Sequence, residues 1–210
     1  MTAQIVLITG RTCTGKTNLG KLLRDSFGYS VISTGRILAD VAKEQNQPVD
    51  RLSLQTLGDE RDHQTGYKWV FDAVQQQETQ MSPDTPIVVD NIRNAGQLEH
   101  FRKYRLRTVF HVHLYARSTE LEERFCRKKA KRPGEAAAIY TQADLIKNES
   151  DIDSFKKDAD VRINTSRTDS MDTLVRVAAR LGLYSPPDFR CVDVLVGGQF
   201  GSEGKGHIAA

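Results

Sequence analysis

The chain has 210 residues, 39% hydrophobic side chains and a formal net charge of +3. This length holds one α/β domain of ordinary size and a little more, and the small net charge excludes the basic footprint of a general nucleic-acid binder. No apolar run approaches the length of a membrane span, and the N-terminus opens on a strand rather than a signal peptide. The three scattered cysteines indicate free thiols in a reducing, cytoplasmic compartment.

Short β-branched runs alternate with helix-like stretches along residues 1–184. The predicted strands are Ile5–Ile8, Tyr29–Ile32, Ile87–Val89, Val109–Leu114 and Val161–Ile163. The predicted helices are Asn18–Phe27, Gly35–Gln45, Arg51–Gln77, Ala95–Tyr104, Ser118–Lys131 and Met171–Leu181. In the last of these, Asp169 supplies an N-cap and Gly182 a C-terminal stop. This alternation predicts a three-layer α/β/α domain with a parallel sheet covered on both faces.

The first strand runs into a glycine loop that fully matches the pattern G-x-x-x-x-G-K-[ST]. The loop reads Gly10-Arg11-Thr12-Cys13-Thr14-Gly15-Lys16-Thr17. Glycines let backbone N–H groups turn toward a phosphate, and the N-terminus of the following helix adds partial positive charge. The motif predicts a P-loop NTPase fold that uses ATP and Mg²⁺, with Lys16 at the β- and γ-phosphates and the Thr17 hydroxyl on the metal.

Three later segments predict a site for the molecule that receives the phosphoryl group. Ser33-Thr34-Gly35-Arg36 follows the second strand and opens a helix. Arg51-x-x-Leu54-Gln55-x-x-Gly58 lies within a helical stretch. The third strand ends at Asp90, with Arg93 and Gln97 shortly after it. Asp90 either orients Mg²⁺ through water or caps a helix, and the sequence favours the two roles about evenly.

A basic segment from Arg124 to Glu149 predicts a helical lid. Its cations are Arg124, Arg127, Lys128, Lys129, Lys131, Arg132 and Lys147. Phosphoryl transfer works mainly by positioning and charge stabilisation, so it needs cations on the donor, on the acceptor and between them. Arg124 and Lys128 share a helical face and are the predicted catalytic lid cations beside Lys16 and Arg93. For the other lid cations a solvated surface charge is at least as good an interpretation.

Residues 1–184 resemble the nucleoside and deoxynucleoside monophosphate kinase branch of the P-loop kinases, which includes the adenylate kinase-like enzymes. Thr34-Gly35 resembles the Thr-Gly that begins their monophosphate site, and the stretch from Asp90 to Gln97 resembles their Asp-Gly-x-Pro-Arg-x-x-x-Gln segment. The segment that starts at Arg51 resembles a motif of phage-type deoxynucleotide kinases. The resemblance implies that the arginine holds the acceptor phosphate and the glutamine touches its base. The implied acceptor-binding residues are Thr34, Gly35, Arg36, Arg51, Gln55, Arg93 and Gln97.

The chain departs from that family at several positions. Ala39 stands where members often carry an arginine, so either Arg36 substitutes for it or the site is weakened. Asn91 and Ile92 replace the Gly and Pro, and the spacing from Asp to Arg is one residue shorter. Elsewhere, His111 and His113 share one face of the fourth strand. A metal site would need a third ligand, so core or crevice histidines are the favoured interpretation.

Residues 185–189 form a proline-rich linker, and residues 190–210 begin a new pattern of strand and glycine loop. Positions 198–207 resemble the opening of adenylosuccinate synthetases, Gly-Gln-Trp-Gly-Asp-Glu-Gly-Lys-Gly-Lys, with seven of ten residues identical. In that family the loop binds GTP and IMP phosphates. The implied second-domain loop residues are Gln199, Gly201, Ser202, Glu203, Gly204 and Lys205.

Ser202 replaces the aspartate that in that family takes a proton from the purine N1 and binds Mg²⁺. Serine cannot serve as that base unaided. Phage relatives that aminate a guanine nucleotide on the way to 2-aminoadenine carry a similar change. We therefore expect residues 190–210 to be the truncated start of a covalently fused domain of this kind, and the alternative is a degenerate or non-catalytic tail.

The sequence as a whole predicts an ATP-dependent kinase of (deoxy)nucleoside monophosphates, which is the N-terminal part of a purine-nucleotide biosynthesis protein. Its expected partners are small-molecule nucleotides and the fused synthetase-like domain, with neither a membrane nor a specific nucleic acid. An alternative is a non-catalytic nucleotide-sensing module that regulates the synthetase, which Ala39 favours. A third is a small-metabolite kinase, which would place apolar or sugar-binding groups where Gln55 and Gln97 stand.

Overall fold

The computed structural model describes residues 4–104, 106–130 and 152–184. Within these ranges the side chains of Arg51, Lys129 and Ala130 are not described. The lid cations Lys131, Arg132 and Lys147, the linker at 185–189 and the loop residues at 199–205 lie outside the described residues.

A parallel sheet forms the middle layer of the domain. Its strands are β1 (Gln4–Thr9), β2 (Ser30–Ser33), β3 (Ile87–Asp90), β4 (Thr108–Tyr115) and β5 (Val161–Asn164). Their order is β2-β3-β1-β4-β5, and each neighbouring pair is parallel. The register pairs Ile8 with Asp90 and Thr9 with His113. The polar ends of β1, β3 and β4 therefore meet at one edge of the sheet, where ligands bind in open α/β sheets.

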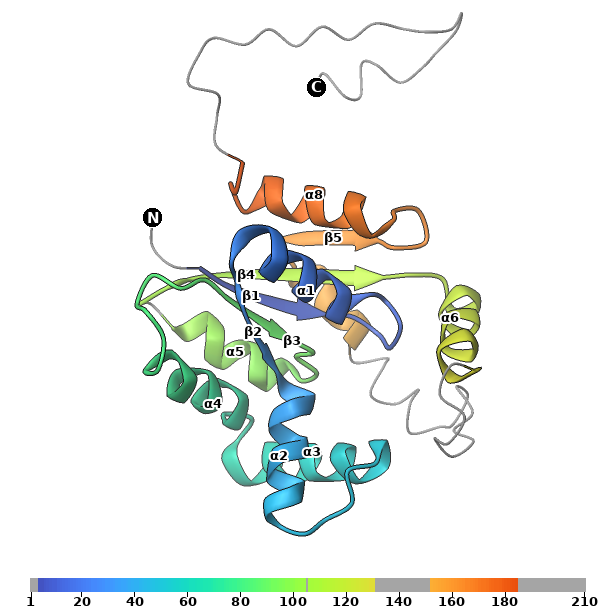
Figure 1. The fold of residues 1–210 in the computed structure, drawn as a ribbon. Helices are drawn as coiled ribbons and strands as arrows, with labels where there is room; N and C mark the ends of the chain where they lie inside the picture. The colour runs from blue at the N-terminus through green and yellow to red at the C-terminus, as the bar shows by residue number, and fades with distance from the viewer. Residues whose placement is uncertain (1–3, 105, 131–151, 185–210) are drawn as a thin grey trace, which may run out of the picture.

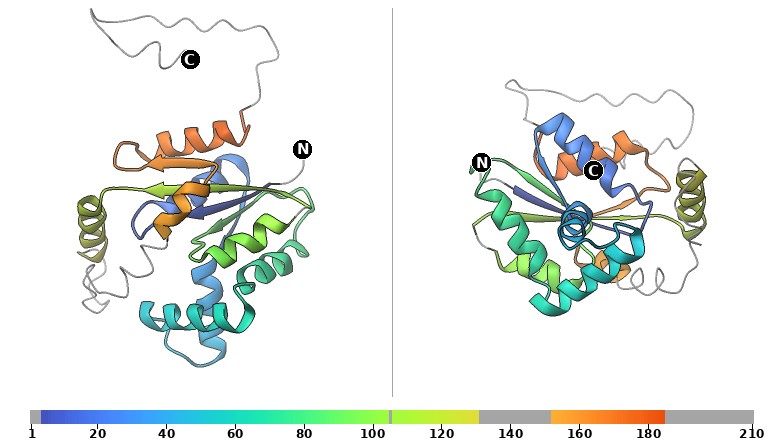
Figure 2. Two further views of the ribbon diagram at one scale, coloured as in Figure 1. Left: turned by 180° about the vertical axis from the view of Figure 1, so that it is seen from behind. Right: turned by 60° about the horizontal axis from the view of Figure 1, so that its bottom comes forward.

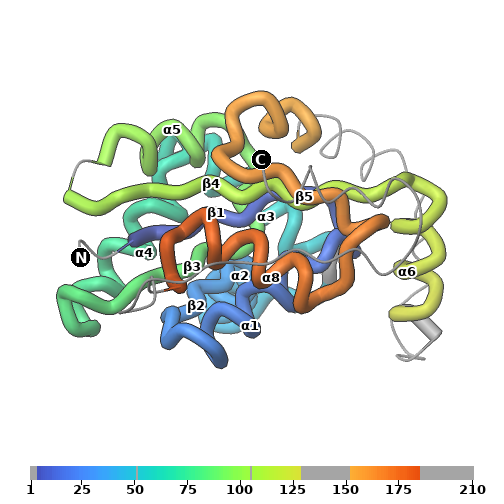
Figure 3. The backbone as a smooth tube through the Cα atoms, turned by 90° about the horizontal axis from the view of Figure 1, so that it is seen from above, coloured from blue at the N-terminus to red at the C-terminus, as the bar shows by residue number. Residues whose placement is uncertain are grey.

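Helices cover both faces of this sheet, which confirms the predicted three-layer fold (Figure 1). The helices are α1 (Lys16–Phe27), α2 (Thr34–Glu44), α3 (Arg51–Thr65), α4 (Trp69–Glu78), α5 (Ala95–Lys103), α6 (Ser118–Ala130) and α8 (Ser170–Arg180), with a 3-10 turn η1 (Phe155–Asp158). Helices α1 and α8 pack together on one face, and the view from behind places α5 and η1 on the other (Figure 2). Helix α6 stands beyond the carboxyl end of β4 (Figure 3).

The two faces of β1 supply the centres of two cores. Ile5 and Leu7 pack with residues of α2, α4 and α5, whereas Val6 and Ile8 pack with residues of α1 and α8. All four side chains are fully buried. This explains why β1 reads as a continuous apolar run rather than an alternating one, as expected for a strand covered on both sides.

The expected single helix over Arg51–Gln77 is wrong, because the structure divides this stretch into α3 and α4. Gly66 has a φ of 58°, and Tyr67 follows with a φ of 68°. The N–H of Tyr67 donates to the carbonyl of Asp62 at 2.8 Å, which closes the end of α3. A glycine in the left-handed region is a common helix terminator. The resulting turn points α4 back toward the sheet, where Trp69 and Val70 are buried.

The predicted ends of α8 are confirmed. The Asp169 side chain accepts a hydrogen bond from the Asp172 N–H at 2.8 Å, as an N-cap does. Gly182 has a φ of 68° just after the last turn. Helix α8 therefore begins and ends at the signals that the sequence supplies.

Candidate active site

The glycine loop after β1 takes a backbone path that only small side chains permit. Gly10 has a φ of 140°, and a Cβ atom there would lie 2.2 Å from the carbonyl oxygen of Leu114. Gly15 has a φ of 99° and is the N-cap of α1. Cys13, with a φ of 66°, is a half-buried filler of the loop. The loop and the first turn of α1 thus have the strand–loop–helix context that a phosphate-binding loop requires.

The loop lysine lies across the loop itself. Lys16 Nζ donates to the carbonyl oxygens of Gly10 at 2.5 Å and Arg11 at 2.8 Å. Arg11 pairs with Asp153 at 2.5 Å, which ties the loop to the segment before η1. Thr17, the predicted metal ligand, is exposed at the start of α1. A cation and a hydroxyl therefore stand together at the N-terminus of this helix.

Asp90 joins the ends of β2 and β3. It is 5% exposed, and its carboxylate accepts a hydrogen bond from the Thr34 N–H at 3.2 Å. Burial raises the pKa of Asp90, against the opposing effects of hydrogen bonds from Ser33 and Thr34 and of the positive charges on Lys16 and Arg93. Two cations from different loops thus act on the same carboxylate.

Asn91 stands in the turn after β3, at the position where the resemblance to the nucleoside monophosphate kinases implies a glycine. Its φ is 65°, a left-handed conformation that asparagine tolerates better than most residues. With its amide turned so that the oxygen faces Arg93, Asn91 accepts hydrogen bonds from Arg93 Nε at 2.9 Å and Nη2 at 3.2 Å. The substitution keeps the turn and gives the guanidinium a neighbour that orients it.

The predicted acceptor residues come together around one cavity of about 310 Å³. Five of them line it: Thr34, Gly35, Gln55, Arg93 and Gln97. Arg36 is exposed and is not part of the lining, and the side chain of Arg51 lies outside the described residues. The three segments that the sequence separates by many residues thus form one site, which we call the acceptor cavity.

The acceptor cavity also has lining residues that sequence reasoning missed. An apolar part comes from Leu38, Val49, Leu54 and Trp69, and two carboxylates come from Asp59 and Asp62. Asp62 lies one helical turn after Gly58 and two turns after Gln55. The helical period therefore places the three residues on one face of α3, and this spacing could have identified Asp62 from the sequence.

Asp62 is the centre of a buried hydrogen-bond network. Its Oδ1 accepts from Trp69 Nε1 at 2.7 Å and from Gln97 Nε2 at 2.8 Å. The Gln97 Oε1 in turn accepts from the N–H of Arg93 at 3.1 Å. Burial raises the pKa of Asp62, partly offset by the hydrogen bonds from Gln97 and Trp69. Trp69 is both buried in the core and part of this network.

A second cavity, of about 300 Å³, lies on the other side of the loop. Its wall includes Thr14, Gly15 and Asn18, together with Arg124 and the segment from Thr165 to Thr173. Arg124 donates to Thr165 Oγ1 at 3.0 Å, to the Thr165 carbonyl at 2.7 Å and to Glu120 at 2.6 Å. The sequence predicted Arg124 as a cation of the lid, but it did not predict the contact with the β5–α8 loop. We call this the donor cavity.

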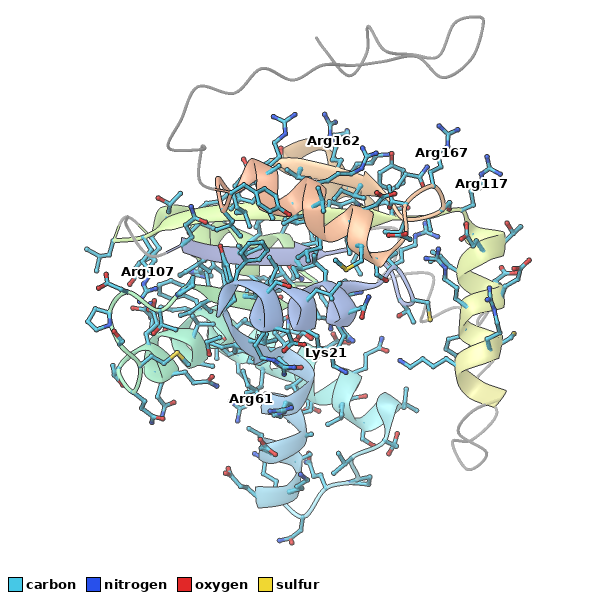
Figure 4. All side chains as sticks on the ribbon, turned by 45° about the horizontal axis from the view of Figure 1, so that its top comes forward. Lys21, Arg61, Arg107, Arg117, Arg162 and Arg167 are labelled. Atoms are coloured by element: carbon cyan, nitrogen blue, oxygen red, sulfur yellow. The ribbon has the colours of Figure 1, made fainter. Side chains whose placement is uncertain are left out.

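The other predicted cations are at the surface. Lys128 is exposed on α6, and Arg127 pairs with Glu123 at 3.8 Å. Arg117, Arg162 and Arg167 point outward around β5 and the start of α6 (Figure 4). Arg107 differs, because it is largely buried in an ion pair with Glu78 at 2.7 Å. These positions give no continuous basic groove in the part of the chain that the structure describes.

The two strand histidines are buried beside the sheet edge, as the favoured interpretation expected. The Thr9 Oγ1 lies 2.7 Å from His111 Nε2 and 2.9 Å from His113 Nδ1. Burial lowers the pKa of each histidine to about 4. Among the described residues, no group of three His, Cys, Asp or Glu side chains is arranged to hold a metal, and no helix has the length and apolarity to cross a membrane.

A phosphate-binding loop on a β2-β3-β1-β4-β5 parallel sheet, with a cavity on each side, has the fold of the P-loop kinases. Residues 6–152 match the model of an AAA domain family, AAA_18, and the chain belongs to this family. No curated protein matches the chain.

Solved kinase structures share the fold at low sequence identity. Shikimate kinase from Aquifex aeolicus superposes with a TM-score of 0.53 and 14% identity, over 85% of this chain and 96% of that one. A gluconokinase from Sinorhizobium meliloti gives a TM-score of 0.54 and 12% identity, over 87% and 93%. Shikimate kinase from Acinetobacter baumannii, in complex with shikimate, gives 0.51 and 16% identity, over 86% and 93%.

Proposed function

We propose that this chain transfers the γ-phosphoryl group of ATP to a nucleoside monophosphate in the acceptor cavity. One observation carries the proposal: the glycine loop that leads to Lys16 follows β1, Arg93 follows β3 and lines the acceptor cavity, and the two strands pair with Ile8 beside Asp90. A cation for the donor phosphates and a cation for the acceptor phosphate thus follow the carboxyl ends of two neighbouring strands. Phosphoryl transfer needs this arrangement, because charge develops between donor and acceptor.

Six of the predicted residues have a role in this proposal. Lys16 contacts the transferred phosphoryl group, and Arg93 holds the acceptor phosphate. Thr17 and Asp90 offer a hydroxyl and a carboxylate, the oxygen donors that suit Mg²⁺, so the residues fit that metal. The bound metal would neutralise charge on the donor phosphates. Arg124 stands at the donor cavity, and Lys128 lies one turn further along α6.

The lining of the acceptor cavity favours a nucleotide over a purely polar metabolite. The apolar patch of Leu38, Leu54 and Trp69 can contact the face of a base, and Arg93 can pair with a phosphate. The structural neighbours named shikimate kinase and gluconokinase keep a second candidate open, a kinase of a small hydroxylated acid. The sensing role remains the alternative outside catalysis, because Ala39 is half-buried in α2 where the resemblance implies an arginine.

A coupled assay of ADP release separates these functions. The chain would be incubated with ATP, Mg²⁺ and one acceptor at a time: the ribo- and deoxynucleoside monophosphates, shikimate and gluconate. We expect turnover with at least one nucleoside monophosphate. Turnover with shikimate or gluconate alone would assign the small-metabolite function. ATP binding without turnover on any acceptor would assign the sensing role.

We also propose that residues 190–210 begin a synthetase-like domain. The support is the sequence resemblance at positions 198–207, since the family match covers residues 6–152. The 210-residue chain should then form no adenylosuccinate by itself. A longer chain, if one exists, should condense aspartate with dGMP in preference to IMP, because the serine at position 202 is smaller than the aspartate of the synthetase family and carries no charge. A clear preference for IMP would refute the 2-amino interpretation.

A further inference from the structure

The Asp62 carboxylate is held rigidly with one oxygen turned to the acceptor cavity. The residue is 8% exposed, and its Oδ1 already accepts two hydrogen bonds, from Trp69 Nε1 and Gln97 Nε2. Within the described residues no hydrogen bond reaches Oδ2, yet this atom is not among the buried side-chain atoms that lack a partner, so solvent reaches it. Asp62 also lines the acceptor cavity, so Oδ2 is the side-chain oxygen that remains available to a ligand there.

Both polar groups of the Gln97 side chain, in contrast, are already hydrogen-bonded within the protein. Its Oε1 accepts from the Arg93 N–H, its Nε2 donates to Asp62, and the side chain is 3% exposed. The carboxylate that Gln97 orients is therefore a lining group that can contact an acceptor, beside Gln55 and Asp59 of the same helix. An ionised carboxylate oxygen only accepts hydrogen bonds, and its two lone pairs require donors from the ligand.

The lining of the cavity carries charges of both signs. Asp59 and Asp62 supply carboxylates from α3, and Arg93 supplies a guanidinium from the loop after β3. A ligand that fits this lining has both a phosphate and hydrogen-bond donors. Leu38 and Trp69 add apolar surface for a flat ring.

We infer that Asp62 selects the acceptor base, and that the base it selects presents two adjacent N–H donors, as a guanine-type ring does at N1 and the 2-amino group. This inference rests on the proposed function. Adenine and cytosine place a ring lone pair beside their amino group, and thymine places carbonyl oxygens on both sides of its N–H. In each case an acceptor would face the carboxylate, and unpaired buried polar groups give strong discrimination between ligands.

The first test changes the ligand and leaves the protein intact. IMP is GMP without the 2-amino group, and AMP also replaces the N1 hydrogen with a lone pair. We expect kcat/KM to fall in the order GMP, IMP, AMP, by roughly tenfold or more between GMP and AMP. Equal values for the three, or a preference for AMP, would overturn the inference while leaving the kinase function intact.

The second test changes one oxygen to a nitrogen. In Asp62→Asn the amide oxygen must remain toward Trp69 and Gln97, which both donate, so the NH₂ group faces the cavity. We expect kcat/KM for GMP to fall by roughly tenfold or more, with no such loss for AMP. Glu60→Gln, which removes an exposed carboxylate from the same helix, should leave the preference unchanged.

The outcomes keep the inference and the proposed function apart. Turnover of nucleoside monophosphates with an unchanged order of preference in Asp62→Asn would remove Asp62 from base selection only. Lack of turnover with every nucleoside monophosphate in the wild-type chain would overturn both. If Asp62→Asn does not fold, as judged by circular dichroism, the comparison of GMP, IMP and AMP on the wild-type chain still decides the question.

Discussion

Replacing His113 should reduce the loss of folding stability that occurs as the pH is lowered. In the folded chain His113 Nδ1 and His111 Nε2 share the hydroxyl of Thr9, at 2.9 and 2.7 Å. The other ring nitrogens, His111 Nδ1 and His113 Nε2, are buried without a hydrogen-bond partner in the described part of the chain. A proton on either ring would therefore be buried without compensation, which is why burial lowers both pKa values to about 4.

The sign of the effect follows from proton linkage. The unfolded histidines have an ordinary pKa of about 6.5, so between pH 6.5 and 4 the unfolded chain binds protons that the folded chain does not. Stability from each histidine is thus complete above pH 6.5, decreases as the pH falls and levels off below pH 4. Integration gives a loss of about 2 kcal/mol per histidine at pH 5 relative to pH 8. The charged side chains that act on His111 are Arg102, Asp158 and Asp160. Those that act on His113 are Asp153, Lys156 and Lys16.

Urea unfolding at pH 8 and pH 5 measures this effect. His113→Asn keeps an oxygen acceptor near Thr9 and removes one titrating group, so the difference in unfolding free energy between the two pH values should shrink by about 2 kcal/mol. The exposed His63 provides the control, because His63→Asn should leave the pH difference as it is in the wild-type chain. An equal pH difference in His113→Asn and wild type would refute the assignment of this acid sensitivity to the buried pair.

Three further substitutions test the loop and the acceptor cavity. Lys16→Ala should lower kcat on the order of 10²-fold or more, because it removes a cation from the developing phosphoryl charge, and wild-type turnover would exclude this loop as the donor site. Arg93→Ala should raise the acceptor KM roughly tenfold or more and leave ATP binding, measured by calorimetry, nearly unchanged. The reverse pattern would move the acceptor phosphate elsewhere. Gly10→Ala should destabilise the fold by several kcal/mol in urea unfolding, since its Cβ would meet the Leu114 carbonyl at 2.2 Å. Gly182→Ala, with open space around its Cβ, should cost only about 1 kcal/mol of left-handed strain, and equal losses in the two variants would contradict the steric argument.

The parts of the fold that the sequence predicted well depend on local chemistry. Each strand is a short β-branched run, and each observed strand overlaps the predicted one within a residue or two. The phosphate-binding loop is set by glycines whose φ values other residues rarely adopt. The break between α3 and α4 was missed although Gly66 marks it, because the polar run from Asp59 to Thr65 is as compatible with a continuous exposed helix as with a helix end.

The parts that were missed depend on contacts between distant segments. Asp62 becomes a cavity residue only when α4 and α5 bring Trp69 and Gln97 against it. The donor cavity forms because Arg124 of α6 reaches Thr165 after β5 and the carbonyl of Cys13 in the loop. Periodicity places a side chain on a face of its own helix, but it does not say which other element that face will meet.

Gln97 shows that a residue can match a family motif and still make different contacts from those that the motif implies. The resemblance gives this glutamine a contact with the acceptor base, yet in the structure its amide oxygen accepts from the Arg93 N–H and its amide nitrogen donates to Asp62. The side chain therefore connects the loop that carries Arg93 with the carboxylate of Asp62. Weakened acceptor binding in a Gln97 variant would follow from the loss of either connection. Weaker binding alone would therefore not demonstrate a contact between Gln97 and the base. A series of acceptors with the same phosphate and sugar but different bases is needed, because only such a series distinguishes a residue that contacts the base from one that positions other residues.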